Sequence, residues 1–404
     1  MRNIMIKREV YLNKIISFRD KPLIKVITGL RRSGKSTLLD LYEQYLKDQH
    51  VPAENIIHLN FEWMGLDAVR DYHQLYTMLK EKIQGKAPVY LLLDEIQQVC
   101  GWERAINSLF AEGLCDIYLT GSNARLLSSE ISTLLSGRYV EIQVFPLSFQ
   151  EYLQFRPEAA RTPDAAFQQY LRFGGMPIIP ALPQTTETIK TVLSGVYDTV
   201  LMKDVVQRND VRDSALLGTV VRYLADTIGN PISTAKISGY LTSKGRKTSV
   251  ITIDNYLGML EEAFIFYRAR RFDIKRKLYL RTLEKFYIVD TGLRNMLLGF
   301  RTGDYGHILE NVVYLELRRR GYEVGVGKLG NLEVDFVATR PDRKVYYQVA
   351  ASVQDAHTLE RELTPLQKIP DQYEKILLTM DRDYIEDYNG IRKQNIIDFL
   401  LEKE

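Results

Sequence analysis

Residues Gly29 to Ser36 read GLRRSGKS, which matches the phosphate-binding pattern G-x-x-x-x-G-K-[ST] without a mismatch. Glycines let the backbone turn so tightly that successive N–H groups face one anion. The Lys35 ammonium group is then expected to reach the β- and γ-phosphates, and the Ser36 hydroxyl to ligate Mg²⁺. We expect the nucleotide contacts to come from nine consecutive residues: Gly29, Leu30, Arg31, Arg32, Ser33, Gly34, Lys35, Ser36 and Thr37.

A pair of carboxylates follows the apolar run VYLLL and completes the chemistry that such a loop requires. Asp94 is placed to hold Mg²⁺, and Glu95 to orient and polarise the attacking water as the catalytic base. An acidic pair after a strand also serves as a helix N-cap, so the pair alone leaves that alternative open. Its occurrence together with the phosphate loop favours catalysis.

Two further polar positions are candidates for contact with the γ-phosphate. The run DIYLTGSN ends in Asn123, our first choice for a side chain that touches the γ-phosphate or the water, with Ser122 as the second choice; the alternative is a plain turn. Arg138 follows a glycine, and it is a candidate arginine finger for the nucleotide of a neighbouring subunit, which would require a homo-oligomer. The alternative for Arg138 is an ordinary surface salt bridge.

The flanking elements support this interpretation of the loop. The β-branched run LIKVIT before the loop predicts a buried strand, and STLLDLYEQYLK after it has leucines and tyrosines at helical spacing. The N-terminus of that helix adds partial positive charge to the anion site. We find no N-K-x-D tetrapeptide of the guanine-selective kind after the loop, which favours ATP over GTP.

Together these motifs resemble the AAA+ superfamily of P-loop NTPases (the ASCE class). GLRRSGKSTLL, LSGRYVEIQVFPLSFQEYL and YLRFGGMPII resemble more narrowly a prokaryotic group in which an AAA-type ATPase module precedes a C-terminal domain of unknown function. The resemblance implies an α/β fold with a parallel sheet in the order 5-1-4-3-2. It also implies ATP hydrolysis with ATP and Mg²⁺ as ligands.

Composition sets the outer limits on the class of protein. The net charge of +3 neither demands nor excludes binding to nucleic acid. The chain of 404 residues is too long for one ordinary hydrophobic core, so we expect several domains. Two cysteines and five histidines argue against a disulfide framework or structural zinc. The N-terminus lacks the apolar region of a signal peptide and no window is apolar enough to span a membrane, so we expect a cytoplasmic location and no membrane partner.

We predict four domains along the chain. Residues 1–155 form the ATPase core, 156–212 a helical lid, 213–285 a winged-helix module and 286–404 a domain related to restriction endonucleases. The winged-helix module is predicted from a helix–helix–helix–hairpin pattern with clustered basic residues. The candidate DNA contacts are Lys244, Arg246, Lys247, Arg270 and Arg271. The alternative is a packing module whose charges are solvated.

The last domain resembles the PD-(D/E)xK nuclease core. Matched by residue, Glu310 is the acid of the helix, Asp335 the metal-binding acid and Gln348 the ligand on the next strand. The position of the catalytic lysine is Ala350, which cannot stabilise charge on a phosphate. Lys328 or Lys344 would have to supply the missing cation. We therefore expect a nuclease-shaped but inactive binding domain.

These observations predict Mg²⁺-dependent hydrolysis of ATP by in-line attack of water, coupled to binding of a partner. Double-stranded DNA and an unidentified protein are the candidate partners. Two alternatives stay open. The first is a slow, nucleotide-dependent binding switch, and the second is an ATP-dependent DNA nuclease.

Overall fold

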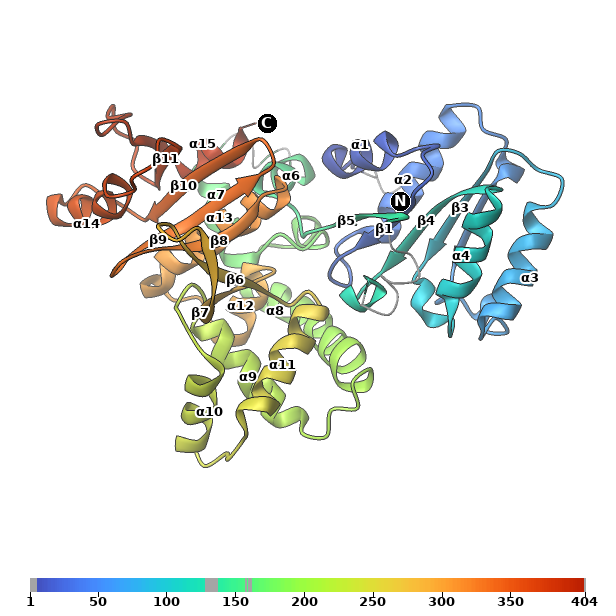
Figure 1. Ribbon diagram of the computed structural model, residues 1–404, viewed down its shortest axis with the longest axis horizontal. Coiled ribbons are helices and arrows are strands. Elements are labelled where there is room, and N and C mark those ends of the chain that lie inside the picture. The colour runs from blue at the N-terminus through green and yellow to red at the C-terminus, as the bar shows by residue number, and fades with distance from the viewer. Residues whose placement is uncertain (1–5, 128–136, 157, 159–161, 403–404) are drawn as a thin grey trace. The chain divides into compact units, whose positions relative to one another are not determined.

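The computed structural model describes residues 6–127, 137–156, 158 and 162–402. The chain divides into two compact units (Figure 1). The first runs to Val144 and includes Glu262–Phe264, and the second contains Phe145–Glu261 and Ile265–Glu404. Among the described residues, no helix has both the length and the apolar character needed to cross a bilayer.

The first unit is built on a parallel five-stranded sheet with the order β2-β3-β4-β1-β5, which confirms the order that the resemblance implied. Its strands are β1 (Ile24–Thr28), β2 (Ile56–Asn60), β3 (Val89–Asp94), β4 (Cys115–Gly121) and β5 (Tyr139–Gln143). Its helices are α1 (Glu9–Ser17), α2 (Lys35–Asp48), α3 (Tyr72–Ile83) and α4 (Trp102–Glu112). Short 3₁₀ turns lie at Ala53–Asn55, Met64–Leu66, Ile96–Gln98 and Ala124–Leu127.

Helices cover both faces of this sheet, which is why every residue of its central strands β1 and β3 is buried. Successive side chains of a strand point to opposite faces. Leu91 and Leu93 of β3 accordingly pack with α3 and α4, whereas Tyr90 and Leu92 pack with α1 and α2. Because the strands are parallel, β1, β3 and β4 all end at one edge of the sheet, and the loops that follow them meet there.

The second unit combines a mixed seven-stranded sheet with many helices. The strand order is β12-β11-β10-β9-β8-β6-β7. The strands are β6 (Phe266–Asp273), β7 (Leu278–Ile288), β8 (Glu323–Leu329), β9 (Leu332–Arg340), β10 (Arg343–Ala350), β11 (Glu374–Thr379) and β12 (Arg392–Asn395).

Helices account for most of the remaining chain of this unit. Those before the sheet are α6 (Phe149–Phe155), α7 (Pro163–Phe173), α8 (Thr186–Thr199), a π-helical segment (Val200–Gln207), α9 (Ser214–Asp226), α10 (Thr234–Ser243) and α11 (Val250–Glu262). Those among and after the strands are α12 (Thr291–Leu298), α13 (Tyr305–Arg319), α14 (Ala356–Gln367) and α15 (Ile396–Leu401). Short 3₁₀ turns lie at Ile179–Ala181 and Thr302–Asp304.

The predicted helix–helix–helix–hairpin pattern is present as α9, α10, α11 and the β6–β7 hairpin, but the hairpin is not a separate wing. Strand β6 pairs in parallel with β8, with Arg271 opposite Val326, so the hairpin extends the C-terminal sheet. The expected boundary between residues 285 and 286 lies inside β7. The pairing satisfies the backbone groups that an edge strand would otherwise leave open.

The FGGMP sequence lies at the junction of α7 and α12. Gly174 has a φ of 82°, and a Cβ built there would lie 2.2 Å from Oδ1 of Asp290. Asp290 accepts hydrogen bonds from the N–H of Gly175 at 2.7 Å and from that of Leu293 at 3.0 Å, so it also caps α12. Burial raises the pKa of Asp290 to about 6 despite these N–H donors. Gly174 is required because this carboxylate packs against its backbone, and Gly175 because a Cβ there would lie 2.5 Å from the carbonyl oxygen of Leu147.

Candidate functional site

The loop between β1 and α2 has a backbone that only certain residues permit. Gly29 has a φ of 141°, and a Cβ there would lie 2.2 Å from the carbonyl oxygen of Val144. Gly34 has a φ of 98° and is the N-cap of α2. Because Gly34 has no side chain to bond the first N–H groups of the helix, these donors remain available to a ligand.

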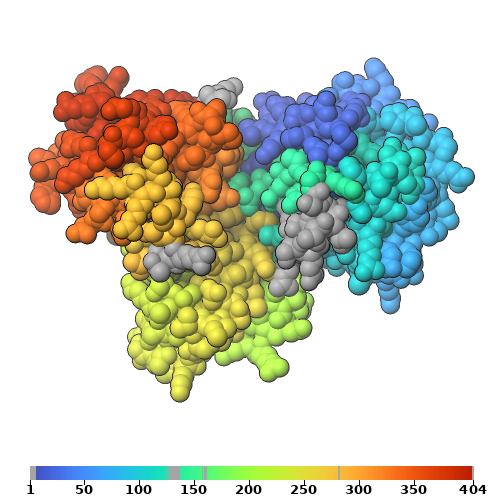
Figure 2. Space-filling model, in the orientation of Figure 1, coloured from blue at the N-terminus to red at the C-terminus, as the bar shows by residue number. Residues whose placement is uncertain are grey.

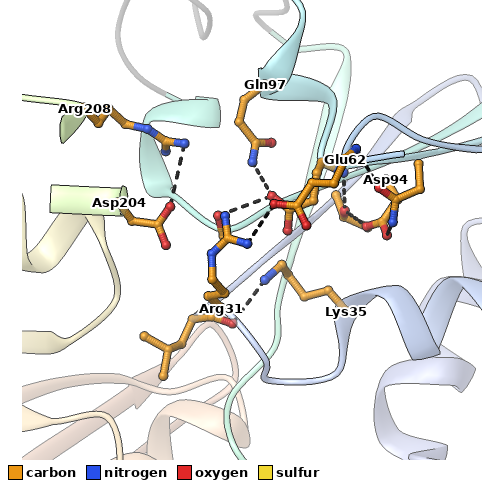
Figure 3. Close-up of polar contacts among 12 residues, drawn as sticks. Arg31, Lys35, Glu62, Asp94, Gln97, Asp204 and Arg208 are labelled. Atoms are coloured by element: carbon orange, nitrogen blue, oxygen red, sulfur yellow. Dashed lines mark hydrogen bonds and ion pairs between the residues drawn. The ribbon is translucent and has the colours of Figure 1, made fainter. Parts of the chain in front are cut away.

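The side chains of the loop include donors that suit an anion. The buried Lys35 Nζ donates to the carbonyl oxygens of Gly29 at 3.0 Å and Leu30 at 3.1 Å, so the ammonium group is held over the loop (Figure 3). Ser36 and Thr37 are exposed. Ser33 is fully buried, and its Oγ has no hydrogen-bond partner among the residues that the structure describes. Uncapped N–H groups, a fixed ammonium and an orphaned hydroxyl are the donors that an anion requires.

Arg8 is a loop contact that the sequence analysis missed. Its Nη1 donates to the carbonyl oxygen of Ser33 at 2.8 Å, and its guanidinium lies 4.5 Å from the centre of the Tyr11 ring. The arginine is 4% exposed, although it precedes α1 near the start of the chain. Its hydrogen bond fixes the orientation of a carbonyl group of the loop. No motif connects a residue so far upstream to the loop, so the sequence carries no signal for it.

Asp94 is held by two neighbours at the carboxyl edge of the sheet. Asn60 Nδ2 donates to its Oδ2 at 2.8 Å, and the Thr120 hydroxyl donates to its Oδ1. Asn60 ends β2 directly opposite Asp94 in the strand register. The carboxylate is 1% exposed, so both hydrogen bonds fix its orientation. Neither Asn60 nor Thr120 was predicted to have a role, although each ends a strand next to the acid.

Glu95 has a left-handed backbone, with a φ of 54°, at the start of a turn that follows β3. Its N–H donates to the Thr120 hydroxyl at 3.0 Å, and its Oε2 accepts from Ser122 Oγ at 3.3 Å and from the Gln97 amide. The structure therefore brings Ser122 and Glu95 together. Asn123 is buried directly after β4, and its role at the γ-phosphate stays a prediction.

The predicted arginines differ in their contacts. Arg31 Nη1 pairs with Glu62 Oε1 at 2.8 Å, as Figure 3 shows, whereas Arg32 is exposed. Arg138 is exposed, and its Nη1 donates to the Asn107 side-chain oxygen at 2.8 Å. Among the residues that the structure describes, this amide is its side-chain partner, and the role of Arg138 as an arginine finger stays a prediction.

A second polar cluster lies in the second unit, where α13, β9 and β10 bring together Glu310, Asp335 and Gln348. Val334 pairs with Gly327, and Val337 with Gly325, so Asp335 and Phe336 both lie opposite Val326. This β-bulge re-aims the Asp335 side chain, as bulges often do beside functional sites. Asp335 Oδ2 accepts from the N–H of Val349 at 2.9 Å, and Gln348 Oε1 accepts from the N–H of Asp335 at 3.3 Å.

The cation of this cluster is Lys285 of β7, which the sequence analysis missed. Its Nζ lies 2.8 Å from Glu310 Oε1, 2.9 Å from Glu333 Oε1 and 3.9 Å from Asp335 Oδ1. Lys344 instead lies 3.8 Å from Asp371, and Lys328 lies in β8 opposite Glu333 in the register. Ala350 is packed in an apolar core. The sequence could have indicated Lys285, because a lysine within the largely apolar strand sequence LEKFYI is unusual.

The surroundings shift the pKa values of Glu310 and Asp335 in opposite directions. Burial alone would raise the pKa of Glu310, but the ammonium of Lys285 and the hydroxyl of Tyr287 at 2.6 Å lower it below its ordinary value. Burial, with the Glu310 carboxylate close by, raises the pKa of Asp335 well above its ordinary value. Burial would lower the pKa of Lys285, but the facing carboxylates outweigh it and raise the pKa. The ammonium group therefore favours the charged form of Glu310, whereas burial disfavours the charged form of Asp335.

The predicted DNA contacts form two groups on the surface of the second unit. Lys244, Arg246 and Lys247 are all exposed in the turn between α10 and α11, whose surface is yellow-green in Figure 2. Arg270 is exposed on β6, and Arg271 is half-buried. The turn precedes α11, which Ser249 caps through the N–H of Thr252 at 3.0 Å.

Comparisons with known proteins agree with the fold of the first unit. A family profile described as AAA domain matches residues 21–153, and one described as Domain of unknown function (DUF8612) matches residues 164–304. An uncharacterized protein of Haemophilus influenzae is 42% identical over 407 residues, with 100% of both chains covered. Uncharacterized protein MJ1544 of Methanocaldococcus jannaschii is 31% identical over 378 residues, covering 90% of this chain and 82% of that protein.

Solved structures include one with a similar fold at low identity. The Walker-type ATPase PABY2304 of Pyrococcus abyssi aligns with a TM-score of 0.52 and 17% identity, over 73% of this chain and 96% of that chain.

Proposed function

The chain belongs to a prokaryotic AAA+ ATPase family in which an AAA domain precedes a domain of unknown function, and from this premise we propose that it hydrolyses ATP with Mg²⁺ and couples its nucleotide state to a partner. The observation that carries the proposal is the shared edge of the first sheet. The phosphate loop follows β1, the acid pair follows β3, and β4 lies between these two strands. Loops on neighbouring parallel strands meet at that edge, where α/β sheets bind their ligands.

Each residue of the site has a defined task in this proposal. The N–H groups of the loop and the Lys35 ammonium bind the β- and γ-phosphates and neutralise charge that develops there. Ser36 and Asp94 would hold Mg²⁺, which supplies further charge neutralisation at the phosphates when bound. Glu95 orients the attacking water, and Asn123 contacts the γ-phosphate or that water.

A slow binding switch is the second candidate, and the contacts of Glu95 favour it over rapid turnover. One oxygen of this carboxylate already accepts from Ser122 and Gln97. Two donors on one oxygen restrict how this carboxylate can turn toward the attacking water, so their release would help Glu95 to act as a general base. We infer slow basal hydrolysis that a partner accelerates by releasing Glu95.

The partner in this proposal is double-stranded DNA or another protein. The exposed turn of Lys244, Arg246 and Lys247 supports DNA, since backbone phosphates are bound by such clusters. An arginine finger would come from Arg138 of a second copy, which makes a homo-oligomer part of the proposal. The helices between residues 156 and 212 would act as a lid.

ATP binding and single-turnover hydrolysis test the proposal directly. We expect Lys35→Ala to abolish tight ATP binding, and Glu95→Gln to bind ATP but hydrolyse it at least about 100-fold more slowly. Lys47→Ala, an exposed lysine of the same helix, is the matched control and should leave both properties unchanged. Unchanged ATP affinity in Lys35→Ala would reject the site. Adding double-stranded DNA separates the candidates, because only a DNA-coupled ATPase gains turnover.

A further inference from the structure

The nuclease resemblance assigns a divalent metal ion to Glu310, Asp335 and Gln348, but the cluster already contains a cation. We propose that the ammonium group of Lys285 takes the place of that ion, so that the cluster is a structural ion-pair site that excludes Mg²⁺ and Mn²⁺. The inference concerns the second unit and does not depend on the proposed ATPase site.

The position of Lys285 is the first argument. Carboxylates from α13 and β9 converge on its Nζ, at 2.8 Å for Glu310 and 2.9 Å for Glu333, with Asp335 at 3.9 Å. The lysine side chain is 3% exposed. In a metal-dependent nuclease the ion would bond these oxygens directly, at about 2.0–2.6 Å. An ion at that distance would be in close contact with the ammonium, so the two cations compete for one place.

One oxygen of each of two acids, Glu310 and Asp335, also accepts hydrogen bonds from neighbouring groups. Glu310 Oε1 accepts from Lys285 and, at 2.6 Å, from the Tyr287 hydroxyl. Asp335 Oδ2 accepts from the backbone N–H of Val349. These bonds hold the two acids in orientations set by Lys285, Tyr287 and the backbone of β10.

Gln348 is turned away from the role of a ligand. Its carbonyl oxygen accepts from the backbone N–H of Asp335, and its amide nitrogen donates to Glu362 Oε2 at 2.8 Å. A glutamine can ligate a metal only through its oxygen. The side chain therefore serves as a connection between β9 and α14 in this arrangement.

The loop after α9 covers the other side of Glu310. A Cβ at Gly229 would lie 3.1 Å from Glu310 Oε2 and 3.1 Å from His307 Nδ1, so the backbone itself lies against the cluster. The N–H of Gly229 donates to the carbonyl oxygen of Phe286 at 3.2 Å, which ties this loop to β7 beside Lys285. A phosphodiester would have to displace the loop to reach Glu310.

Titration with Mn²⁺, followed by electron paramagnetic resonance, tests the proposal on the full-length, nucleotide-free protein. We compare wild type, Asp335→Asn, Lys285→Met and the double variant Lys285→Met/Asp335→Asn. Wild type and Asp335→Asn should bind the same amount of Mn²⁺ below about 1 mM, which is the weak end of carboxylate sites. Lys285→Met should bind one more Mn²⁺ per chain than wild type, with at least about tenfold tighter affinity. The double variant should not bind this additional ion. Lys275→Met, an exposed lysine of the same hairpin, should gain nothing.

Either of two results overturns the proposal. Wild type that binds more Mn²⁺ than Asp335→Asn would show a metal site that tolerates the lysine. A folded Lys285→Met variant that gains no ion would show that the lysine is not what excludes metal. If Lys285→Met does not fold, the comparison of wild type with Asp335→Asn still tests the proposal. Mn²⁺-dependent nicking of plasmid DNA by wild type, lost in Asp335→Asn, would equally overturn the proposal.

Discussion

The side-chain amide of Asn60 donates to Oδ2 of Asp94 at 2.8 Å, across the last register pair of β2 and β3. The hydrogen bond links the edge strand of the first sheet to the acid that we assign to Mg²⁺. Groups that orient a metal ligand contribute strongly to metal affinity, because a carboxylate that is free to rotate loses its preferred geometry.

We expect Asn60→Ala to weaken the apparent Mg²⁺ affinity of ATP hydrolysis by about 10- to 100-fold while ATP binding without metal stays unchanged. Loss of the amide leaves only the Thr120 hydroxyl to orient Asp94. Turnover as a function of free Mg²⁺ measures the effect. Asn255→Ala, an exposed asparagine of α11, is the control. Equal Mg²⁺ dependence of Asn60→Ala and wild type would contradict this role.

Arg8→Ala should weaken ATP binding by roughly tenfold, since a charged hydrogen bond to the loop is worth about 1.5–3 kcal/mol and part of this energy maintains the loop conformation. Nη1 of Arg8 holds the carbonyl group of Ser33, and the variant lets that peptide group rotate. Titration with a fluorescent ATP analogue measures the change. Arg8→Lys should recover part of the affinity, whereas Arg104→Ala, an exposed arginine of α4, should resemble wild type. A normal affinity in Arg8→Ala would assign the arginine to stability alone.

The core of the first unit could be predicted because its signals are local. The loop motif, the apolar runs and the acid pair each lie within about a dozen residues, and the resemblance supplied the strand order, which the structure confirms. Asn60 and Arg8 were missed because only the register of β2 and the packing of α1 bring them to the site. Such contacts between distant segments leave no pattern in the sequence.

The second unit was predicted less completely for the same reason. Glu310, Asp335 and Gln348 follow the order of a known core, and the structure places them in neighbouring elements. Lys285 lies on the β6–β7 hairpin, which we had assigned to a different domain. Only the pairing of β6 with β8 shows that this hairpin belongs to the same sheet.

Two isosteric changes in the acids around Lys285 should differ sharply in how much they lower the free energy of unfolding. Glu310→Gln leaves Lys285 without its closest charge partner, and loss of one member of a buried pair costs about 3–5 kcal/mol. Asp335→Asn removes an acid whose charged form burial already disfavours, so we expect a smaller loss, below about 1 kcal/mol. Urea unfolding of both variants beside wild type measures the difference. Equal losses would show that both acids are ionised.

The same cluster predicts a dependence of stability on pH. The pKa of Asp335 is raised on folding, so above the ordinary value of an aspartate the folded state binds more protons than the unfolded state. The free energy of unfolding contributed by this group therefore falls as the pH rises through that window. Asp335→Asn removes the group and should show a shallower decline toward alkaline pH. Parallel curves of unfolding free energy against pH for the two proteins would contradict the assignment.

The basic turn between α10 and α11 gives the test of DNA as the partner. In the variant Lys244→Ala/Arg246→Ala/Lys247→Ala we expect affinity for double-stranded DNA to fall for every sequence tested, because these side chains would bind backbone phosphates. The slope of log K against log salt should become shallower by about 2 to 3, roughly one for each phosphate that the variant no longer neutralises. Fluorescence anisotropy at several salt concentrations measures both quantities. The triple variant Lys7→Ala/Lys14→Ala/Lys82→Ala removes the same charge from exposed positions of the first unit and should keep the slope. If both variants lose affinity equally, DNA binding depends on net charge rather than on this turn. If wild type shows no salt-dependent binding at all, double-stranded DNA is not the partner, and a protein becomes the candidate.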